Sequence, residues 1–156
     1  MKNTTGSRSF TSWILILLNS ILGIGAVISG AMLFVAPDGR LLQMSTDAVQ
    51  GTPFPDFLIP GLILFTFMGL LPIFVGYSLI KRPAWNGINM LNPFNRYHWA
   101  WTASLTSGLV LLIWIATETL LIGYEFILQP IMAAWGILII LLTLLPNVRR
   151  FYGPKA

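Results

Sequence analysis

The chain contains no cysteine, only one histidine and few charged residues. Without cysteine it has neither disulfides nor thiolate metal ligands, so redox chemistry through sulfur is excluded. A single histidine, His98, excludes a histidine-rich metal site or a haem held by two histidines within one chain. The sequence also lacks a Walker loop, a glycine-rich dinucleotide turn and a Ser/His/Asp set at compatible depths. We therefore predict no catalytic residues, no metal and no cofactor.

What the chain has instead is hydrophobic residues. They make up 56% of its 156 residues, whereas 9% are charged, far below the roughly 25% of soluble domains. A helix rises about 1.5 Å per residue, so about 20 apolar residues cross about 30 Å of hydrocarbon. Four stretches meet this length, at about residues 13–35, 57–80, 99–122 and 127–145. The sequence thus predicts a single all-α domain over residues 1–156, an integral membrane four-helix bundle.

Basic residues are distributed unevenly among the connections between these spans. A net charge of +4 would suit nucleic acid in a soluble protein, but here the basic residues flank apolar spans and form no stripe with stacking aromatic rings. Eight of them fall on the side of the termini: Lys2, Arg8, Lys81, Arg82, Arg96, Arg149, Arg150 and Lys155. Arg40 alone lies in a connection on the other side. The positive-inside rule therefore predicts that both termini are cytoplasmic, and we expect no nucleic-acid partner.

The first span resembles a signal peptide only in its positive start. Its apolar run is longer than the 7–15 residues of a signal-peptide core, and no small-residue cleavage site clearly ends it, so we expect an uncleaved helix. Small residues in this span form two pairs with helical spacing, Gly25 with Ser29 and Ala26 with Gly30, which favour close helix packing. In the second span, Pro72 removes a backbone hydrogen bond and predicts a kink.

Two connections leave alternatives open. Residues 36–56 begin with the turn Pro37-Asp38-Gly39 and continue with spaced apolar residues, so they form either a small cap over the outer mouth or a loop along the headgroups. On the cytoplasmic side, asparagines recur every three residues, at Asn86, Asn89, Asn92 and Asn95. This regular spacing fits a binding motif, but asparagine is also a residue that builds turns.

Glu118 is the only charged side chain inside a predicted span. A carboxylate in a span costs about 2.5–3.5 kcal/mol on insertion scales unless a partner compensates it. Helical spacing places Glu118 on the same stripe as Ser104 and Gly108, about 12 Å outward of the membrane midplane.

Depth in the membrane selects the candidate partners of Glu118. Gln129 is the best hydrogen-bond partner, because it lies at the same depth just beyond a short turn, and Arg40 is the best charge partner. The candidate ligand-binding residues are therefore Glu118, Gln129, Arg40, Thr117 and Ser29.

Two interpretations of this polar layer remain open. In the structural one, Glu118 binds Gln129 or water, or reaches toward the outer interface, and sets the register of the third and fourth spans. In the functional one, Glu118 is the centre of a pocket in the outer half of the bundle that binds a cation, a proton or a polar lipid headgroup.

Two segments carry a resemblance to known proteins. Gly30-Ala-Met-Leu-Phe-Val-Ala-Pro-Asp-Gly39, followed by Thr52-Pro-Phe-Pro-Asp-Phe-Leu-Ile-Pro-Gly61, resembles a pattern in small four-span bacterial membrane proteins of unassigned function. The similarity extends to Trp114, Glu118 and Gln129-Pro130, and so covers most of the chain. It implies a multi-pass protein of the bacterial inner membrane and brings no activity with it.

The leading functional hypothesis is a non-catalytic accessory or interaction subunit of a membrane complex. Its expected partners are the lipid bilayer and either other membrane-protein subunits or further copies of the chain. The alternative is a small protein that binds or transports an ion, a proton or a lipid headgroup through Glu118.

Overall fold

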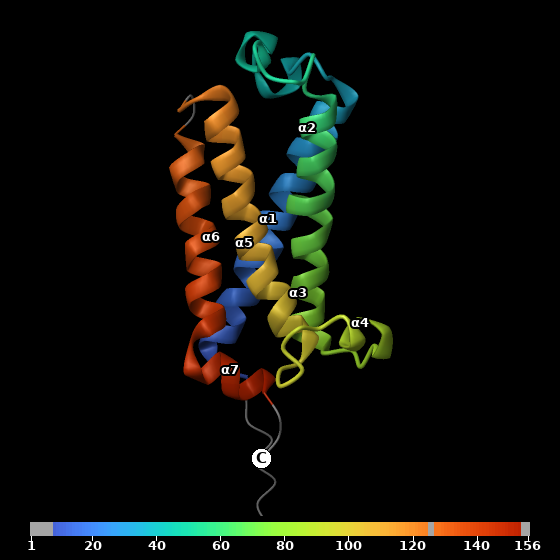
Figure 1. Ribbon diagram of the computed structural model, residues 1–156, viewed down its shortest axis with the longest axis vertical. Helices are drawn as coiled ribbons and strands as arrows, with labels where there is room; N and C mark the ends of the chain where they lie inside the picture. Colours follow the sequence, from blue (N-terminus) through green and yellow to red (C-terminus); the bar gives the residue numbers. More distant parts are fainter. Residues whose placement is uncertain (1–7, 125–126, 154–156) are drawn as a thin grey trace, which may run out of the picture.

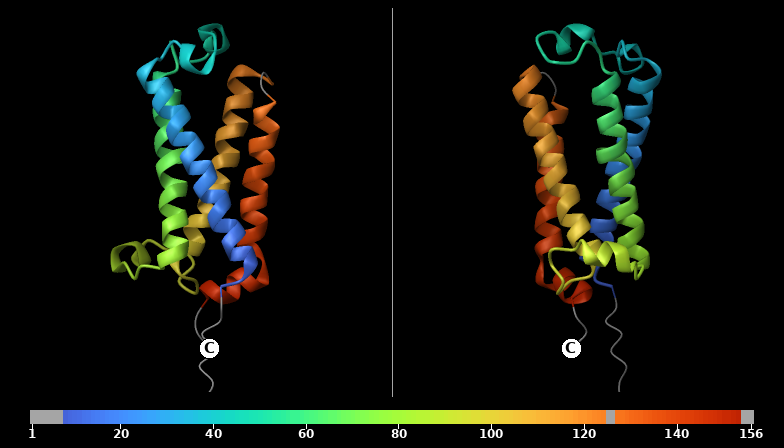
Figure 2. Two further views of the ribbon diagram at one scale, coloured as in Figure 1. Left: turned by 180° about the vertical axis from the view of Figure 1, so that it is seen from behind. Right: turned by 45° about the vertical axis from the view of Figure 1, so that its right-hand side comes forward.

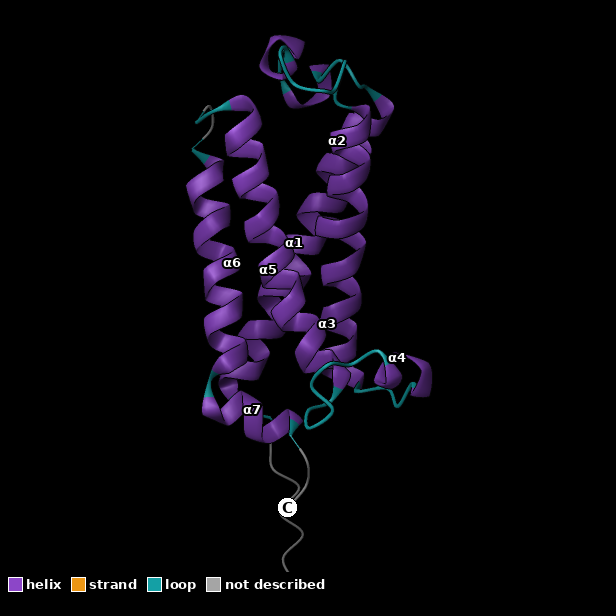
Figure 3. Cartoon of the chain, viewed as in Figure 1, coloured by secondary structure: helices purple, strands orange, loops and turns teal. Residues whose placement is uncertain are grey.

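The computed structural model describes residues 8–124 and 127–153, and all secondary structure in these ranges is helical (Figure 3). The long helical rods run along the long axis of the molecule (Figure 1). They are α1 (Phe10–Val35), a second rod made of α2 (Leu58–Ile63), η3 (Leu64–Leu70) and α3 (Leu71–Lys81), then α5 (Trp99–Ile122) and α6 (Leu128–Leu144). Residues 36–57 lie at one end, here the cap end, and the described parts of both termini lie at the other, here the terminal end.

Three of these rods are long and apolar enough to cross a membrane. They are α1 with 26 residues, Leu58–Lys81 with 24 and α5 with 24. The fourth, α6, qualifies together with α7 (Pro146–Tyr152), from which it is bent by 63°. The length and composition of these helices therefore support a helical membrane protein. The observed helices begin and end within about three residues of the predicted spans.

Glycines set the close packing of α1 on the second rod. A Cβ added at Gly30 would lie 2.7 Å from the backbone nitrogen of Phe65, and one at Gly69 would lie 2.7 Å from the side chain of Val27. The predicted packing role of Gly30 is confirmed. Gly25 is different, since a Cβ there would meet nothing within 4 Å. Gly25 therefore packs on none of the described residues and lies on the exposed face of α1.

The helix widens just before Pro72, the residue for which the sequence predicts a kink. The seven residues of η3, just before α3, form a π-helix that closes with a hydrogen bond from the Leu71 N–H to the Thr66 carbonyl. Pro72 follows at the start of α3. Proline has no N–H to donate, and the hydrogen bonds just before it span five residues instead of four. The rod still continues as one span from Leu58 to Lys81.

Helices α5 and α6 form the second close pair, and the two pairs diverge toward the cap end (Figure 2). Gly108 lies against Gly136, with 3.0 Å between an added Cβ and the Gly136 carbonyl oxygen. Nearby, the buried hydroxyls of Ser104 and Thr143 share a hydrogen bond of 2.9 Å. The stripe predicted through Ser104 and Gly108 therefore does face a neighbouring helix.

The cap end carries its own small core. Val49 and Phe57 are buried against Leu33 at the end of α1. Two short 3-10 helices, η1 (Arg40–Leu42) and η2 (Thr46–Val49), lie within this segment. Residues 36–56 therefore form a compact segment packed on the end of α1.

The side chains of Arg8 and Tyr152 tie the terminal end to the last turn of α3. The Arg8 guanidinium donates to the carbonyls of Leu79 (3.3 Å) and Ile80 (2.7 Å), and the Tyr152 hydroxyl also donates to Leu79 (2.8 Å). Burial raises the pKa of Tyr152 to about 12, so its hydroxyl remains a donor. These bonds satisfy carbonyls of the last turn of α3 that have no partner within the helix.

Candidate functional site

The polar site at the cap end joins α5 to α6. The Gln129 side-chain amide donates to Glu118 Oε1 at 3.3 Å and to the Gly123 carbonyl at 3.1 Å. The structure thus brings Glu118 and Gln129 together across the short connection, as their depths predicted. Trp114 lies one helical turn before Glu118 on α5.

Gln129 is the most buried residue of this site. Its side chain is only 2% exposed, because it lies in the first turn of α6 against α5. Its Nε2 has two acceptors, but its Oε1 is buried without a donor among the residues that the structure describes. Such an unpaired oxygen costs about 1–3 kcal/mol unless a ligand or water binds it.

Three other candidate residues do not join this site. Arg40 pairs with Asp38 at 3.8 Å on the cap, and both side chains are exposed. Thr117 is exposed and donates to the carbonyl of Ile113 in its own helix. Ser29 is half-buried on α1, which packs on the second rod and on α6. Sequence reasoning chose Ser29 by depth, Thr117 because it adjoins Glu118, and Arg40 as the only basic residue on that side. None of these criteria fixes the direction in which a side chain points.

Sequence reasoning did not identify a pocket at the terminal end, between α7 and the connection of residues 82–98. The asparagine repeat was the signal for it, and the structure divides its members. Asn92 is buried and holds its loop, since it donates to Phe94 and Tyr97 and accepts from Thr102. Asn89, Asn92 and Asn95 all line the pocket, but Asn89 and Asn95 are exposed there.

His98 begins α5 beside this pocket and caps the helix through Nδ1, which accepts from the Ala100 N–H at 3.2 Å. Burial lowers the pKa of His98 from 6.5, and the charge of Arg82 lowers it further. The folded state therefore binds this proton more weakly than the unfolded chain does. Stability from His98 is complete above about pH 6.5 and decreases as the pH falls below that value.

Replacement of His98 tests this dependence. His98→Asn keeps a capping acceptor that does not titrate. We expect its thermal midpoint to fall less than that of the wild type between about pH 7 and about pH 5, the range in which histidine titrates. Equal losses in the two proteins would contradict a role for His98 in acid sensitivity.

Chemically, the cap-end site offers a carboxylate, an unpaired amide oxygen and a backbone carbonyl, all oxygen ligands. The described residues contain no group of three or more His, Cys, Asp or Glu side chains able to hold a metal ion. No protein-family model, curated protein or solved structure matches the chain.

Proposed function

We propose that the chain is a four-helix bundle of the bacterial inner membrane with both termini in the cytoplasm. The separation of charge supports this orientation. Six described basic residues lie at the terminal end, namely Arg8, Lys81, Arg82, Arg96, Arg149 and Arg150. The described acids lie at or near the cap end, namely Asp38, Asp47, Asp56 and Glu118. By the positive-inside rule, the cap faces outward.

Within this bundle, the site of Glu118 and Gln129 binds a small monovalent cation or a proton near the outer membrane surface. The observation that carries this function is the buried Gln129 Oε1, which has no hydrogen-bond donor among the described residues. Beside it, the Glu118 carboxylate has no cationic partner among those residues. A charged side chain within a span and an unpaired buried oxygen both cost free energy. A bound cation would offset both costs.

Glu118→Gln tests this function. It keeps an oxygen to accept from Gln129 and removes the charge. In detergent, replacing choline chloride with sodium or potassium chloride at constant ionic strength should raise the thermal midpoint of the wild type. Ligand at 100 times its Kd stabilises a protein by about 2.7 kcal/mol. We expect Glu118→Gln and Gln129→Met to lose this response.

Thr117→Val is the matched control, because Thr117 adjoins Glu118 in sequence but is exposed and bonds to its own helix. It should respond to the salts as the wild type does. If the occupant is a proton, midpoints will not depend on the cation, and in a His98→Asn background, which removes the histidine titration, they will depend on pH with Glu118 and not with Glu118→Gln. A Glu118→Gln protein that responds to both pH and cation like the wild type would refute the site.

A second candidate function is that of an accessory subunit without catalytic activity. The face of α1 around Gly25 favours it, since Gly25 has open space beside it and small residues let helices approach closely. Mild detergent extraction should recover a stoichiometric membrane partner or a second copy of the chain, and Gly25→Leu should release it. Recovery of a monomer alone would count against this function.

A further inference from the structure

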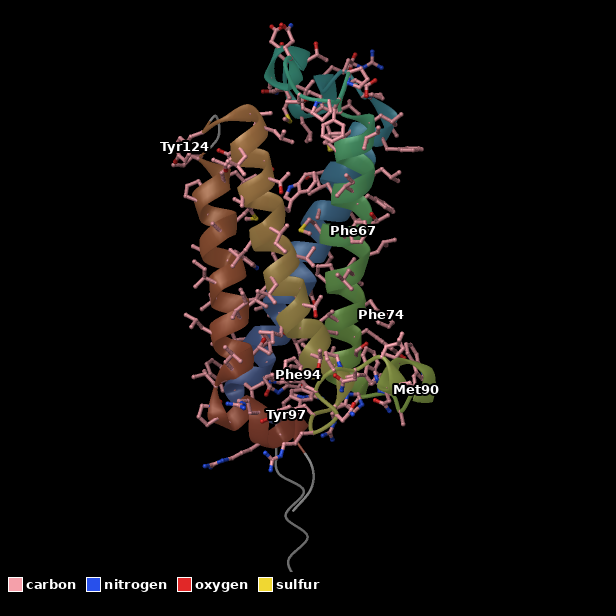
Figure 4. The ribbon with its side chains drawn as sticks, in the orientation of Figure 1. Phe67, Phe74, Met90, Phe94, Tyr97 and Tyr124 are labelled. Atoms are coloured by element: carbon pink, nitrogen blue, oxygen red, sulfur yellow. The ribbon has the colours of Figure 1, made fainter. Side chains whose placement is uncertain are left out.

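The pocket at the terminal end has a volume of about 520 Å³, within the range of small-molecule sites. It opens beside α7, near the positions of Tyr97 and Phe94 in Figure 4. Its lining is almost entirely polar and aromatic: Asn89, Asn92, Asn95, Arg96, Tyr97, His98, Tyr152 and Gly153. It is far from the cap-end site, at the opposite end of α5.

Several donors in this lining have no partner in the part of the chain that the structure describes. Asn89, Asn95 and Arg96 are exposed, and their side chains make no hydrogen bond or ion pair with the described residues. Asn92 provides the contrast, because all of its polar atoms are used to hold the loop. The pocket therefore combines a rigid base with free amide and guanidinium donors.

The surroundings of the pocket are electropositive. Arg149 donates to the Tyr97 hydroxyl at 2.9 Å, and the charge of Arg82 acts on His98. Neither the pocket lining nor the described part of α7 contains an acidic residue. A cation is therefore disfavoured here, and an anion is attracted.

We propose that this pocket binds a phosphate group, with Arg96 as its charged anchor and Asn89 and Asn95 as neutral donors. Guanidinium matches phosphate geometry by two parallel hydrogen bonds, and amide N–H groups supply further donors to the remaining oxygens. The pocket lies where the spans end, at the expected level of lipid headgroups. The phosphate belongs either to an anionic lipid or to a soluble molecule.

Two binding experiments on the full-length protein distinguish these sources. In the first, native mass spectrometry of the detergent-solubilised protein measures retention of phosphatidylglycerol, with phosphatidylcholine as the zwitterionic reference. In the second, calorimetry measures binding of inorganic phosphate. Preference for phosphatidylglycerol alone identifies a lipid headgroup, whereas binding of inorganic phosphate identifies a soluble source. If the protein shows neither, the proposal is overturned.

Variants separate the pocket from general surface charge. Arg150→Gln is the matched control, since Arg150 is exposed at the same end but outside the pocket. Arg150→Gln should weaken binding of an anionic ligand by no more than about fivefold, the effect of losing one basic residue near an anionic surface. Arg96→Gln should weaken binding of the retained ligand by about tenfold or more, because it also loses charge-assisted hydrogen bonds.

Asn89→Ala/Asn95→Ala keeps every charge and should still weaken binding about fivefold, through loss of the neutral donors. Equal effects of Arg96→Gln and Arg150→Gln, or unchanged binding in the double asparagine variant, would assign the attraction to surface charge and overturn the pocket. Because these side chains are exposed, the variants should keep the wild-type thermal midpoint.

Discussion

Gly30→Ala is expected to destabilise the protein by about 2 kcal/mol or more. The new methyl group would lie 2.7 Å from the Phe65 nitrogen and 2.8 Å from the Gly61 carbonyl oxygen. Overpacking usually costs about 1–3 kcal/mol, but here the obstructing atoms are backbone and cannot rotate away. Alanine favours a helix over glycine by about 1 kcal/mol, which reduces the loss without reversing it. The measurement is the thermal midpoint in one detergent.

Gly25→Ala is the matched control for this prediction. It is the same substitution in the same helix, but the added carbon meets nothing within 4 Å. Only the gain in helix propensity remains, so its midpoint should equal or exceed that of the wild type. If Gly30→Ala and Gly25→Ala behave alike, α1 and the second rod do not pack through Gly30.

Trp101→Ala should be the most destabilising substitution at the terminal end, with a cost of about 3–5 kcal/mol. Trp101 is only 3% exposed. Its ring stacks on Tyr97 with 4.5 Å between centroids and meets Phe94 edge-on at 5.7 Å. Its indole N–H also donates to the Thr143 carbonyl at 2.7 Å, which ties α5 to α6. Thermal unfolding followed by circular dichroism measures the loss.

Two comparisons apportion this effect. Trp101→Phe keeps most of the ring and loses the hydrogen bond, so it should cost about 1–3 kcal/mol for the unpaired carbonyl. Trp13→Ala removes the same side chain from α1, where it is 51% exposed, and should cost much less. Losses of similar size for Trp101→Ala and Trp13→Ala would show that burial at the terminal end does not determine stability.

The helices could be predicted because hydrophobic runs and their lengths are one-dimensional properties. The pairing of Glu118 with Gln129 could be predicted for a related reason, since a short turn fixes the depth of both residues. Arg40 could not be placed in the same way. It lies on a connection long enough to form its own core, and within that core it pairs with Asp38 instead of Glu118.

Rotation of a helix about its axis was the second thing that the sequence left open. Both pairs of small residues in the first span have the spacing for helix packing, yet only the pair Ala26 and Gly30 is buried. Gly25 is next to Ala26 in sequence but has open space beside it. Which pair faces inward depends on the surface of the second rod, and that surface is shaped by the π-helical turn before Pro72. Neither the surface of the second rod nor the π-helical turn can be predicted from the local sequence of α1.

The bonds at the terminal end also order the events of biosynthesis. Leu79 receives its hydroxyl donor from Tyr152, and the Tyr152 carbonyl accepts from the His98 N–H at 2.7 Å. A nascent chain that has already inserted its first three helices still lacks this residue. These two contacts therefore form only after α7 has left the ribosome. Until then, these two contacts at the terminal end are missing.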